Sequence, residues 1–345
     1  MENNPNNISI AKKKSGTVVS VLFRFGLPLA ITIALVWYMF TKIDFTQLWA
    51  TVRHGVDYKW ILLAMGVSVF SHVFRALRWR LQLRAIGVNA PLMALCCSIF
   101  GTYALNLIFP RLGEVWRCTY ISRLEHAPFP KVLGSMVADR LSDTLTVLML
   151  LLLTLVVANA QIIAFMDKYP IGEDIVHTVC SPWFWAGCVL LGAVCVLLVR
   201  SLRHTRPVKA LLRICADIWG GFYAIVSMKG RGAFVVYTIA IWGCYFLQLY
   251  VAFYAFSCTF RLISEPDTLF GLIPCLVAFV LSSIGMAVPS NGGLGPWNMC
   301  IIFGLALYAV PEAQAASMSI VVWSAQTVML IILGIFTAIY TSKKR

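Results

Sequence analysis

Long runs of apolar residues, separated by short charged segments, dominate this chain of 345 residues. A helix needs about 20 mostly apolar residues to cross the hydrocarbon core of a bilayer. Such runs recur along the whole chain and predict an all-α polytopic membrane protein. We expect about six full transmembrane helices, near residues 18–40, 60–80, 131–157, 182–199, 233–257 and 317–340.

Two further apolar stretches, 92–110 and 268–310, are interrupted by proline and glycine. The first bends within NLIFPRLGEVWRC (106–118), where charges of both signs follow the apolar run. Irregular backbone at membrane depth needs protein or a water-filled cavity to satisfy its polar groups. We therefore expect two re-entrant helical hairpins beside a polar cavity. Three full crossings within 268–340 are the alternative, against which the short segment 297–310 argues.

Composition supports the membrane assignment. Charged residues make up 12% of the chain and apolar residues 60%, whereas soluble domains carry about 25% charged residues. The loops leave no room for a separate soluble catalytic domain, so 1–345 is expected to form a single transmembrane domain. The 11 cysteines have no C-x-x-C spacing and the 5 histidines are dispersed. This indicates buried thiols, and we expect no metal site, no cofactor and no nucleic-acid partner.

The distribution of charge predicts the topology. Transmembrane proteins carry an excess of Lys and Arg in their cytoplasmic segments. With both termini cytoplasmic and both hairpins re-entrant, the cytoplasmic segments hold 20 Lys and Arg against 3 Asp and Glu, and the opposite side holds 5 against 8. The cytoplasmic segments are then 1–24, 75–84, 123–131, 200–231 and 343–345.

The order of these elements suggests an internal repeat. Residues 1–160 read helix, helix, hairpin, helix, and residues 182–345 read the same in the opposite orientation. NLIFPRLGE aligns with GMAVPSNGG, which places Pro110 with Pro289 and Gly113 with Gly292. Inverted repeats built on interrupted helices are typical of secondary transporters.

The first hairpin carries candidate binding residues. Arg111, Glu114 and Arg117 are spaced three apart, and side chains at this spacing are neighbours on a helix. The planar guanidinium group of arginine suits phosphate oxygens. We predict that Arg111 or Arg117 holds a lipid phosphate and that Glu114 orients one of them. Charges solvated at the membrane interface are the alternative.

The helix that follows contains VADRLSDTL, with Asp139 and Asp143 on one face and Arg140 three residues before Asp143. At about 1.5 Å per residue, Asp143 lies about 18 Å along the helix from Lys131. We expect a buried ion-pair network with the arginines of the hairpin. Proton coupling, or recognition of an amine by the two carboxylates, is compatible with that network.

Two other segments have polar residues with more than one interpretation. HVFRALRWRLQLR (72–84) places Arg75 and Arg78 near the cytoplasmic end of the second helix, with Trp79 at headgroup level. These residues are typical of snorkelling topology anchors, and attraction for anionic headgroups is the alternative. Gln248 and Gln326 lie inside apolar helices and are expected to form interhelical hydrogen bonds.

The second bend, VPSNGGLGPWN (288–298), lacks charged side chains. Gly292 and Gly293 allow close approach of the backbone, and N–H groups at the start of the next helix can bind an anion. Asn291 and Asn298 would add polar side chains to such a site. A purely structural bend is the alternative.

Taken together, four motifs resemble those of a family of flippase-like membrane proteins. This family is similar to the transmembrane domain of lysylphosphatidylglycerol synthases. The four motifs are RALRWR (75–80), NLIFPRLGEVWR (106–117), ADRLSD (138–143) and PSNGGLGPWN (289–298). The resemblance covers nearly the whole chain and implies a bacterial inner (plasma) membrane protein that moves phospholipids or polyprenyl-linked lipids. It does not extend to the soluble aminoacyl-transfer domain of the synthases, so synthase activity is not expected.

The chain departs from the pattern of that family in its last motif. There the glycines are followed by a glutamate, where this sequence has Pro296, Trp297 and Asn298. This departure removes the carboxylate that a carboxylate-dependent step at the second hairpin would use, and it leaves open whether the substrate differs from that of the family.

The leading hypothesis is a lipid translocator and not an enzyme. An anionic headgroup would enter a midplane cavity between the hairpins and pair with Arg111 and Arg117. A membrane-embedded phosphoryl or glycosyl transferase and a non-transporting assembly factor are the alternatives. In the transferase, Glu114, Asp139 and Asp143 would act as bases or metal ligands. In the translocator, Glu114, Asp139, Arg140 and Asp143 together would balance the charge of the headgroup and its two paired arginines.

Overall fold

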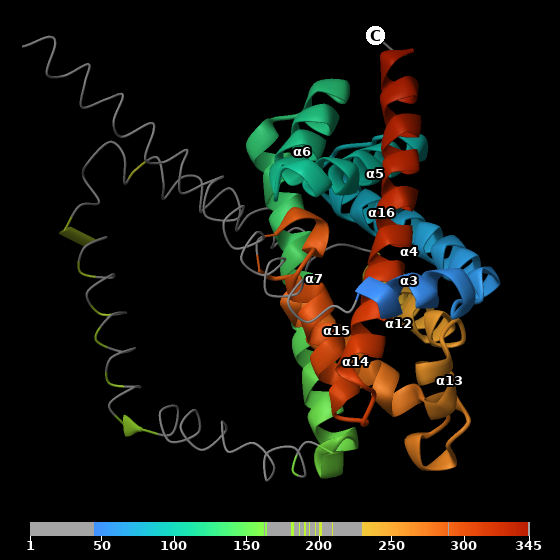
Figure 1. The fold of residues 1–345 in the computed structure, drawn as a ribbon. Coiled ribbons are helices and arrows are strands. Elements are labelled where there is room, and N and C mark those ends of the chain that lie inside the picture. The colour runs from blue at the N-terminus through green and yellow to red at the C-terminus, as the bar shows by residue number, and fades with distance from the viewer. Residues whose placement is uncertain are drawn as a thin grey trace, which may run out of the picture.

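The computed structural model describes residues 45–161 and 230–343 except Pro289, together with isolated positions between 163 and 209. Within these residues every element of regular secondary structure is a helix (Figure 1), which confirms the all-α prediction for this part of the chain. The helices predicted near 18–40 and 182–199 lie outside the continuously described ranges.

The first described half contains five helices, and the second contains five helices and two short 3-10 turns. Prolines and one aspartate stand at the N-terminal ends of several helices. At the start of α4, the Asp57 carboxylate accepts from the Lys59 N–H at 3.1 Å, as helix N-caps do. The elements are α3 (Phe45–His54), α4 (Tyr58–Ala85), α5 (Leu92–Ile108), α6 (Leu112–Leu124), α7 (Phe129–Val157), α12 (Arg231–Phe253), α13 (Ser257–Ile263), η2 (Pro266–Thr268), α14 (Leu272–Gly285), η3 (Asn291–Gly293), α15 (Pro296–Ala306) and α16 (Glu312–Ser342).

Five segments of the described chain are long and apolar enough to cross a membrane. Four of them, in α4, α7, α12 and α16, are spans that the hydropathy pattern predicts. The fifth, Pro266–Gly285, is the first limb of the second interrupted stretch. Because this limb reaches spanning length, the number of full crossings and the re-entrant path of the chain stay predictions.

Each interrupted stretch folds as two helices joined by a bend. In the first pair, the Gly113 N–H donates to the Asn106 side chain at 2.9 Å, and the Thr102 hydroxyl donates to the Gly113 carbonyl at 3.2 Å. In the second pair, glycines bring α14 and α15 together, with Gly285 against the backbone of Pro296. Small residues allow such close helix approach inside membranes.

The two bends contact each other. The Asn291 side chain donates to the Ile108 carbonyl at 3.0 Å, and the Arg111 guanidinium donates to the Ala287 carbonyl at 3.3 Å. The bends that align in the sequence therefore lie side by side in the structure. The inverted symmetry of the two halves stays a prediction.

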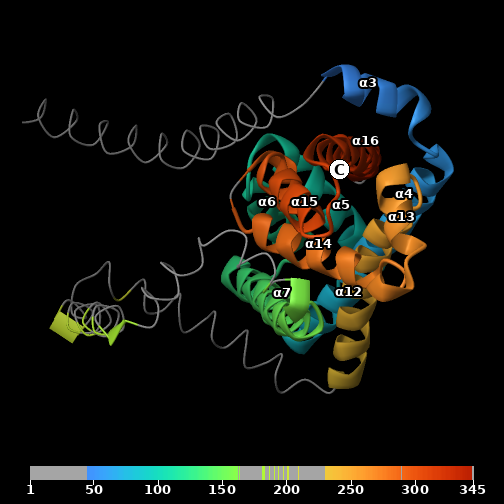
Figure 2. The ribbon, with the colours of Figure 1, turned by 60° about the horizontal axis from the view of Figure 1, so that its bottom comes forward.

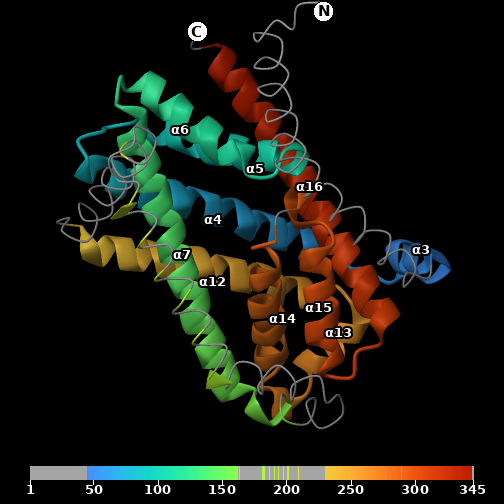
Figure 3. The same ribbon diagram turned by 90° about the vertical axis from the view of Figure 1, so that its left-hand side faces the viewer.

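The remaining helices pack around these pairs. α12 packs along α4, and α7 crosses α4 (Figure 3). α15 packs against both α14 and α16, and α3 lies at the edge against α16 (Figure 2). The outer part of α7 exposes large apolar side chains, as a lipid-facing surface does: Leu148, Met149, Leu152 and Val156.

A chain of hydrogen bonds links three of the helices. The Gln248 side chain on α12 donates to Gln326 on α16 at 2.7 Å, and Gln326 donates to the Ser68 hydroxyl on α4 at 3.1 Å. The interhelical role expected for both glutamines is confirmed.

Replacing Gln326 with leucine is expected to lower the free energy of unfolding by about 1 kcal/mol, because interhelical hydrogen bonds in membranes contribute on this scale. Thermal unfolding in detergent measures the change. Gln314→Leu is the matched control, since Gln314 lies on the same helix outside this hydrogen-bonded chain. Equal melting temperatures for Q326L and wild type would contradict the expectation.

Candidate functional site

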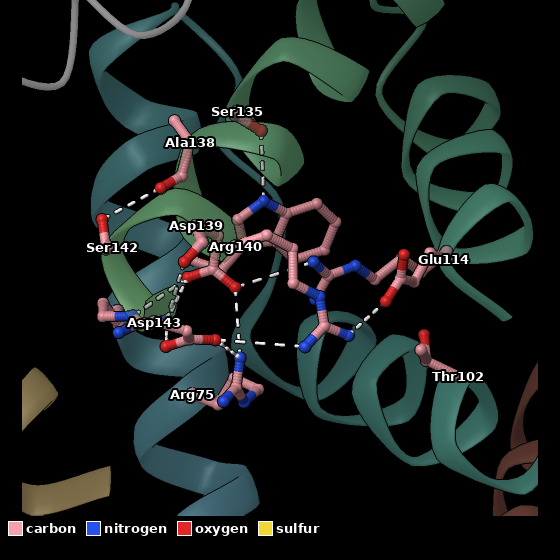
Figure 4. A network of polar contacts seen from close by, with 12 residues as sticks. Arg75, Thr102, Glu114, Ser135, Ala138, Asp139, Arg140, Ser142 and Asp143 are labelled. Atoms are coloured by element: carbon pink, nitrogen blue, oxygen red, sulfur yellow. Dashed lines mark hydrogen bonds and ion pairs between the residues drawn. The ribbon is translucent and has the colours of Figure 1, made fainter. Parts of the chain in front are cut away.

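Two arginines of α4 and two aspartates of α7 form the centre of a buried ion-pair cluster (Figure 4). Arg75 Nη1 lies 2.7 Å from Asp143 Oδ2 and 3.4 Å from Asp139 Oδ2. Arg78 Nη2 lies 2.6 Å from Asp139 Oδ1 and 2.7 Å from Asp143 Oδ1. Spacings of three and four residues give each pair one helix face, and the crossing of α4 and α7 turns these faces toward each other.

The prediction that Arg75 and Arg78 snorkel to the membrane surface is wrong. Their side chains are 3% and 0% exposed. Two carboxylates on the neighbouring helix are fixed partners for the arginines, whereas headgroups are mobile ones. Trp79 is also buried, and its Nε1–H donates to the Ser135 hydroxyl on α7 at 3.1 Å.

Arg117 of α6 extends the cluster. Its Nη2 lies 3.6 Å from Asp139 Oδ2, and its guanidinium carbon lies 4.6 Å from the centre of the Trp79 ring, a cation–π arrangement. The side chain is buried. The predicted network between the aspartates of α7 and the first hairpin is confirmed for this arginine.

Glu114 forms an ion pair with Arg140 of α7 (Figure 4), and Arg140 Nη1 also lies 4.0 Å from Asp143 Oδ2. The predicted pairing of Glu114 with Arg111 or Arg117 is therefore wrong. Arg111 precedes α6 with a left-handed backbone, φ 65°, so helical spacing does not apply to it. The Arg140 side chain is 36% exposed, so the cluster reaches the protein surface here.

These contacts define the charged cluster, which holds four arginines and three acidic residues and has a net charge of +1. Several arginine donors have no hydrogen-bond partner within the described part of the chain: Nε and Nη2 of Arg117 and Nε of Arg140. Buried donors without partners are costly. Arg117 belongs to α6, and Arg140 of α7 pairs with Glu114 of α6, so these donors lie where α6 meets the cluster. The charged cluster consists of Arg75, Arg78, Glu114, Arg117, Asp139, Arg140 and Asp143.

The other predicted site residues lie at the contacting bends. Arg111 is exposed and bonds to the second bend, outside the charged cluster. Asn291, Gly292 and Gly293 form the turn η3. Both glycines have positive φ, and an added Cβ at Gly292 would lie 2.5 Å from the Leu107 side chain. These residues let the two bends pack closely.

A comparison with protein families identifies the chain. The family model described as the lysylphosphatidylglycerol synthase TM region matches residues 26–334. The chain belongs to this family. It is thus a multi-pass membrane protein of a lipid-related family, and the resemblance noted from its motifs is confirmed. Neither curated proteins nor solved structures gave a match.

The motifs that suggested this family have distinct structural roles. RALRWR, NLIFPRLGEVWR and ADRLSD supply the charged cluster, and PSNGGLGPWN supplies the second bend. Asn298, at the position expected for a glutamate of the family, is fully buried. Its side chain accepts from the Gly295 N–H at 3.2 Å and donates to the Ser319 hydroxyl of α16 at 3.3 Å. Asn298 therefore connects the bend to α16.

Sequence reasoning missed two tyrosines at the cluster. The Tyr245 hydroxyl on α12 accepts from Arg75 Nε at 3.3 Å and lies 3.4 Å from the Tyr103 hydroxyl on α5. The sequence could have indicated Tyr245, because this residue lies three positions before Gln248 and therefore on the same polar face of the helix. Tyr103 gave no such signal in its apolar stretch.

Proposed function

We propose that this protein is a lipid translocator, which moves an anionic or lipid-linked headgroup across the bilayer by way of the charged cluster. The observation that supports this most is the cluster itself, seven ionisable side chains on α4, α6 and α7. Two of these helices are long enough to span a membrane. Ionisable groups inside membranes are costly and mark substrate or ion pathways.

The charge balance of the cluster favours an anion. Its net charge is +1, and the donors without partners belong to Arg117 and Arg140. A phosphate accepting from these two arginines would satisfy those donors and balance the surplus charge. The headgroup would enter beside Arg140, where the cluster reaches the surface, while the acyl chains stay in the surrounding lipid.

The bends complete the proposal. We propose that α5–α6 and α14–α15 are re-entrant hairpins of an inverted repeat, whose contacting bends lie near the membrane midplane. Arg111 and Asn291 would then position the bends.

The protein would lie in the bacterial inner membrane with both termini cytoplasmic. Without the buried Arg75 and Arg78, 18 Lys and Arg remain on the predicted cytoplasmic side against 3 acidic residues, so the orientation is the same.

The pairing of the carboxylates favours transport over catalysis. Asp139 and Asp143 each accept from Arg75 and Arg78, and Glu114 pairs with Arg140. A general base or metal ligand needs a carboxylate oxygen facing its substrate or ion. Here these oxygens face arginines, which suits acidic residues that balance charge.

Replacing Arg117 with glutamine is expected to slow translocation about 10- to 100-fold, because a hydrogen bond to a charged group contributes about 1.5–3 kcal/mol. The assay uses proteoliposomes of phosphatidylcholine and phosphatidylglycerol, with a trace of fluorescent phosphatidylglycerol. Quenching of the outer leaflet by dithionite reports movement between leaflets. Arg123→Gln, on the exposed end of the same helix, is the matched control.

Two results would contradict the proposal. One is wild-type protein that moves none of the labelled phosphatidylglycerol or polyprenyl phosphate tested. The other is chemical conversion of the lipid that depends on a divalent metal, which would favour the transferase. Equal loss of rate in R117Q and R123Q would show a nonspecific effect of surface charge and would contradict the role of Arg117.

A further inference from the structure

A buried histidine lies beside the charged cluster. His72 of α4 is 2% exposed, and neither Nδ1 nor Nε2 has a hydrogen-bond partner among the described residues. A neutral imidazole has one donor and one acceptor, and leaving both unsatisfied in a buried site is costly. The ring packs against Phe100 and Tyr103, and its two nitrogens stay available to a proton or another polar partner.

The neighbours of His72 connect it to the cluster. Arg75 lies one turn further along α4, on the same face. The ring centre of Tyr103 on α5 lies 4.7 Å from that of His72, and the Tyr103 hydroxyl meets Tyr245 on α12, which bonds to Arg75. The contacts of this part of α4 bring in further titratable, charged and polar groups from the neighbouring helices: Tyr103 of α5, Tyr245 of α12, Asp139, Arg140 and Asp143 of α7, and Gln326 of α16.

Charge counting gives His72 a role in the transport cycle. The empty cluster has a net charge of +1. A singly charged headgroup lowers this to zero, and a proton bound at His72 restores it to +1. The empty site and the site loaded with headgroup and proton then have the same charge. While the cluster is empty, its surplus charge and the nearby Arg75 disfavour a proton on His72. A bound headgroup balances that charge and removes the repulsion, so the proton binds together with the headgroup.

We infer that His72 binds a proton that crosses the membrane together with the anionic headgroup. This inference rests on the proposed translocation. The proton comes from the aqueous phase on the side where the headgroup enters, adds to a ring nitrogen of His72, and leaves on the other side with the headgroup. The two ligands raise each other's affinity, as linkage requires. Asp139 and Asp143 are unsuited to this role because arginines already pair with both.

Proteoliposomes separate proton coupling from simple anion movement. The vesicles contain phosphatidylcholine, phosphatidylglycerol and a trace of fluorescent phosphatidylglycerol. With the membrane potential clamped to zero by valinomycin and equal potassium, a pH difference of about one unit is expected to concentrate the labelled lipid about tenfold in the alkaline leaflet at 1:1 coupling. A membrane potential without a pH difference is expected to leave the distribution unchanged, because the cargo has no net charge.

His72→Gln is expected to abolish the accumulation driven by the pH difference, whereas His126→Gln, in the exposed turn after α6, keeps it. Accumulation driven by potential in the wild type, or accumulation driven by the pH difference in H72Q, would overturn the inference while the translocator stands. Absence of any movement in the wild type would overturn both. The wild-type gradients test the inference even if H72Q does not fold.

Discussion

Replacing Asp139 with asparagine is expected to destabilise the protein more than any other single change in the charged cluster. Asp139 is fully buried and lies within 3.6 Å of Arg75, Arg78 and Arg117. Removing one partner of a buried ion pair costs about 3–5 kcal/mol, because the other charge stays buried without compensation. D139N has nearly the size of the original side chain, so the effect is electrostatic and not steric.

The measurement is thermal unfolding of purified protein in detergent, followed by translocation in vesicles. Asp267→Asn is the matched control, since Asp267 lies exposed in the turn η2. We expect D139N to unfold at a much lower temperature and to lose transport, and D267N to behave like the wild type. Wild-type melting and transport in D139N would contradict the structural role of the cluster.

A double substitution tests whether charge balance is the cause. D139N raises the net charge of the cluster from +1 to +2, and Arg117→Gln returns it to +1. Residues of one ion-pair network show non-additive effects of about 0.5–3 kcal/mol. We therefore expect R117Q to lower stability less in the D139N background than in the wild type. Strict additivity would show that the two side chains act independently.

The sequence predicted the helical class and several spans, because hydropathy records directly which segments prefer lipid. It also predicted that Asp139 and Asp143 join a buried network, since carboxylates deep in a membrane need partners. It did not predict that Arg75 and Arg78 are those partners. Hydropathy places these arginines near the end of a span, where arginine side chains usually snorkel to the membrane surface. That expectation fails when another helix covers their face. Only the crossing of α4 and α7 in the structure shows that α7 covers it.

The ion pair of Glu114 was missed for a local reason. Spacing of three residues predicts contacts only where the backbone is helical throughout. The chain leaves helical geometry at Arg111, whose φ is 65°, so Arg111 and Glu114 do not share a helix face. Glu114 turns instead to Arg140, which is 26 residues away in the sequence. The sequence could suggest the bend from Pro110 and Gly113 but not the direction of the side chains after it.

Replacing Gly113 with alanine is expected to separate the two helices of the first hairpin. An added Cβ would collide with the Thr102 carbonyl oxygen, and it would lie 2.7 Å from the Thr102 Cα. Backbone atoms have no alternative rotamer, so α5 and α6 must move apart. Overpacking of this kind costs about 1–3 kcal/mol. Because α6 carries Glu114 and Arg117, the same shift would weaken their contacts with α7.

Gly66→Ala on α4 is the control, since nothing lies within 4 Å of a Cβ at Gly66 and alanine favours helix over glycine by about 1 kcal/mol. We expect G66A to melt at or above the wild-type temperature with normal transport, and G113A to melt lower and transport slowly. If G113A kept full stability but lost transport, the close approach at Gly113 would be needed for movement of the hairpin during transport and not for the stability of the fold. If it kept both, the contact with Thr102 would have no role in holding Arg117 against Asp139.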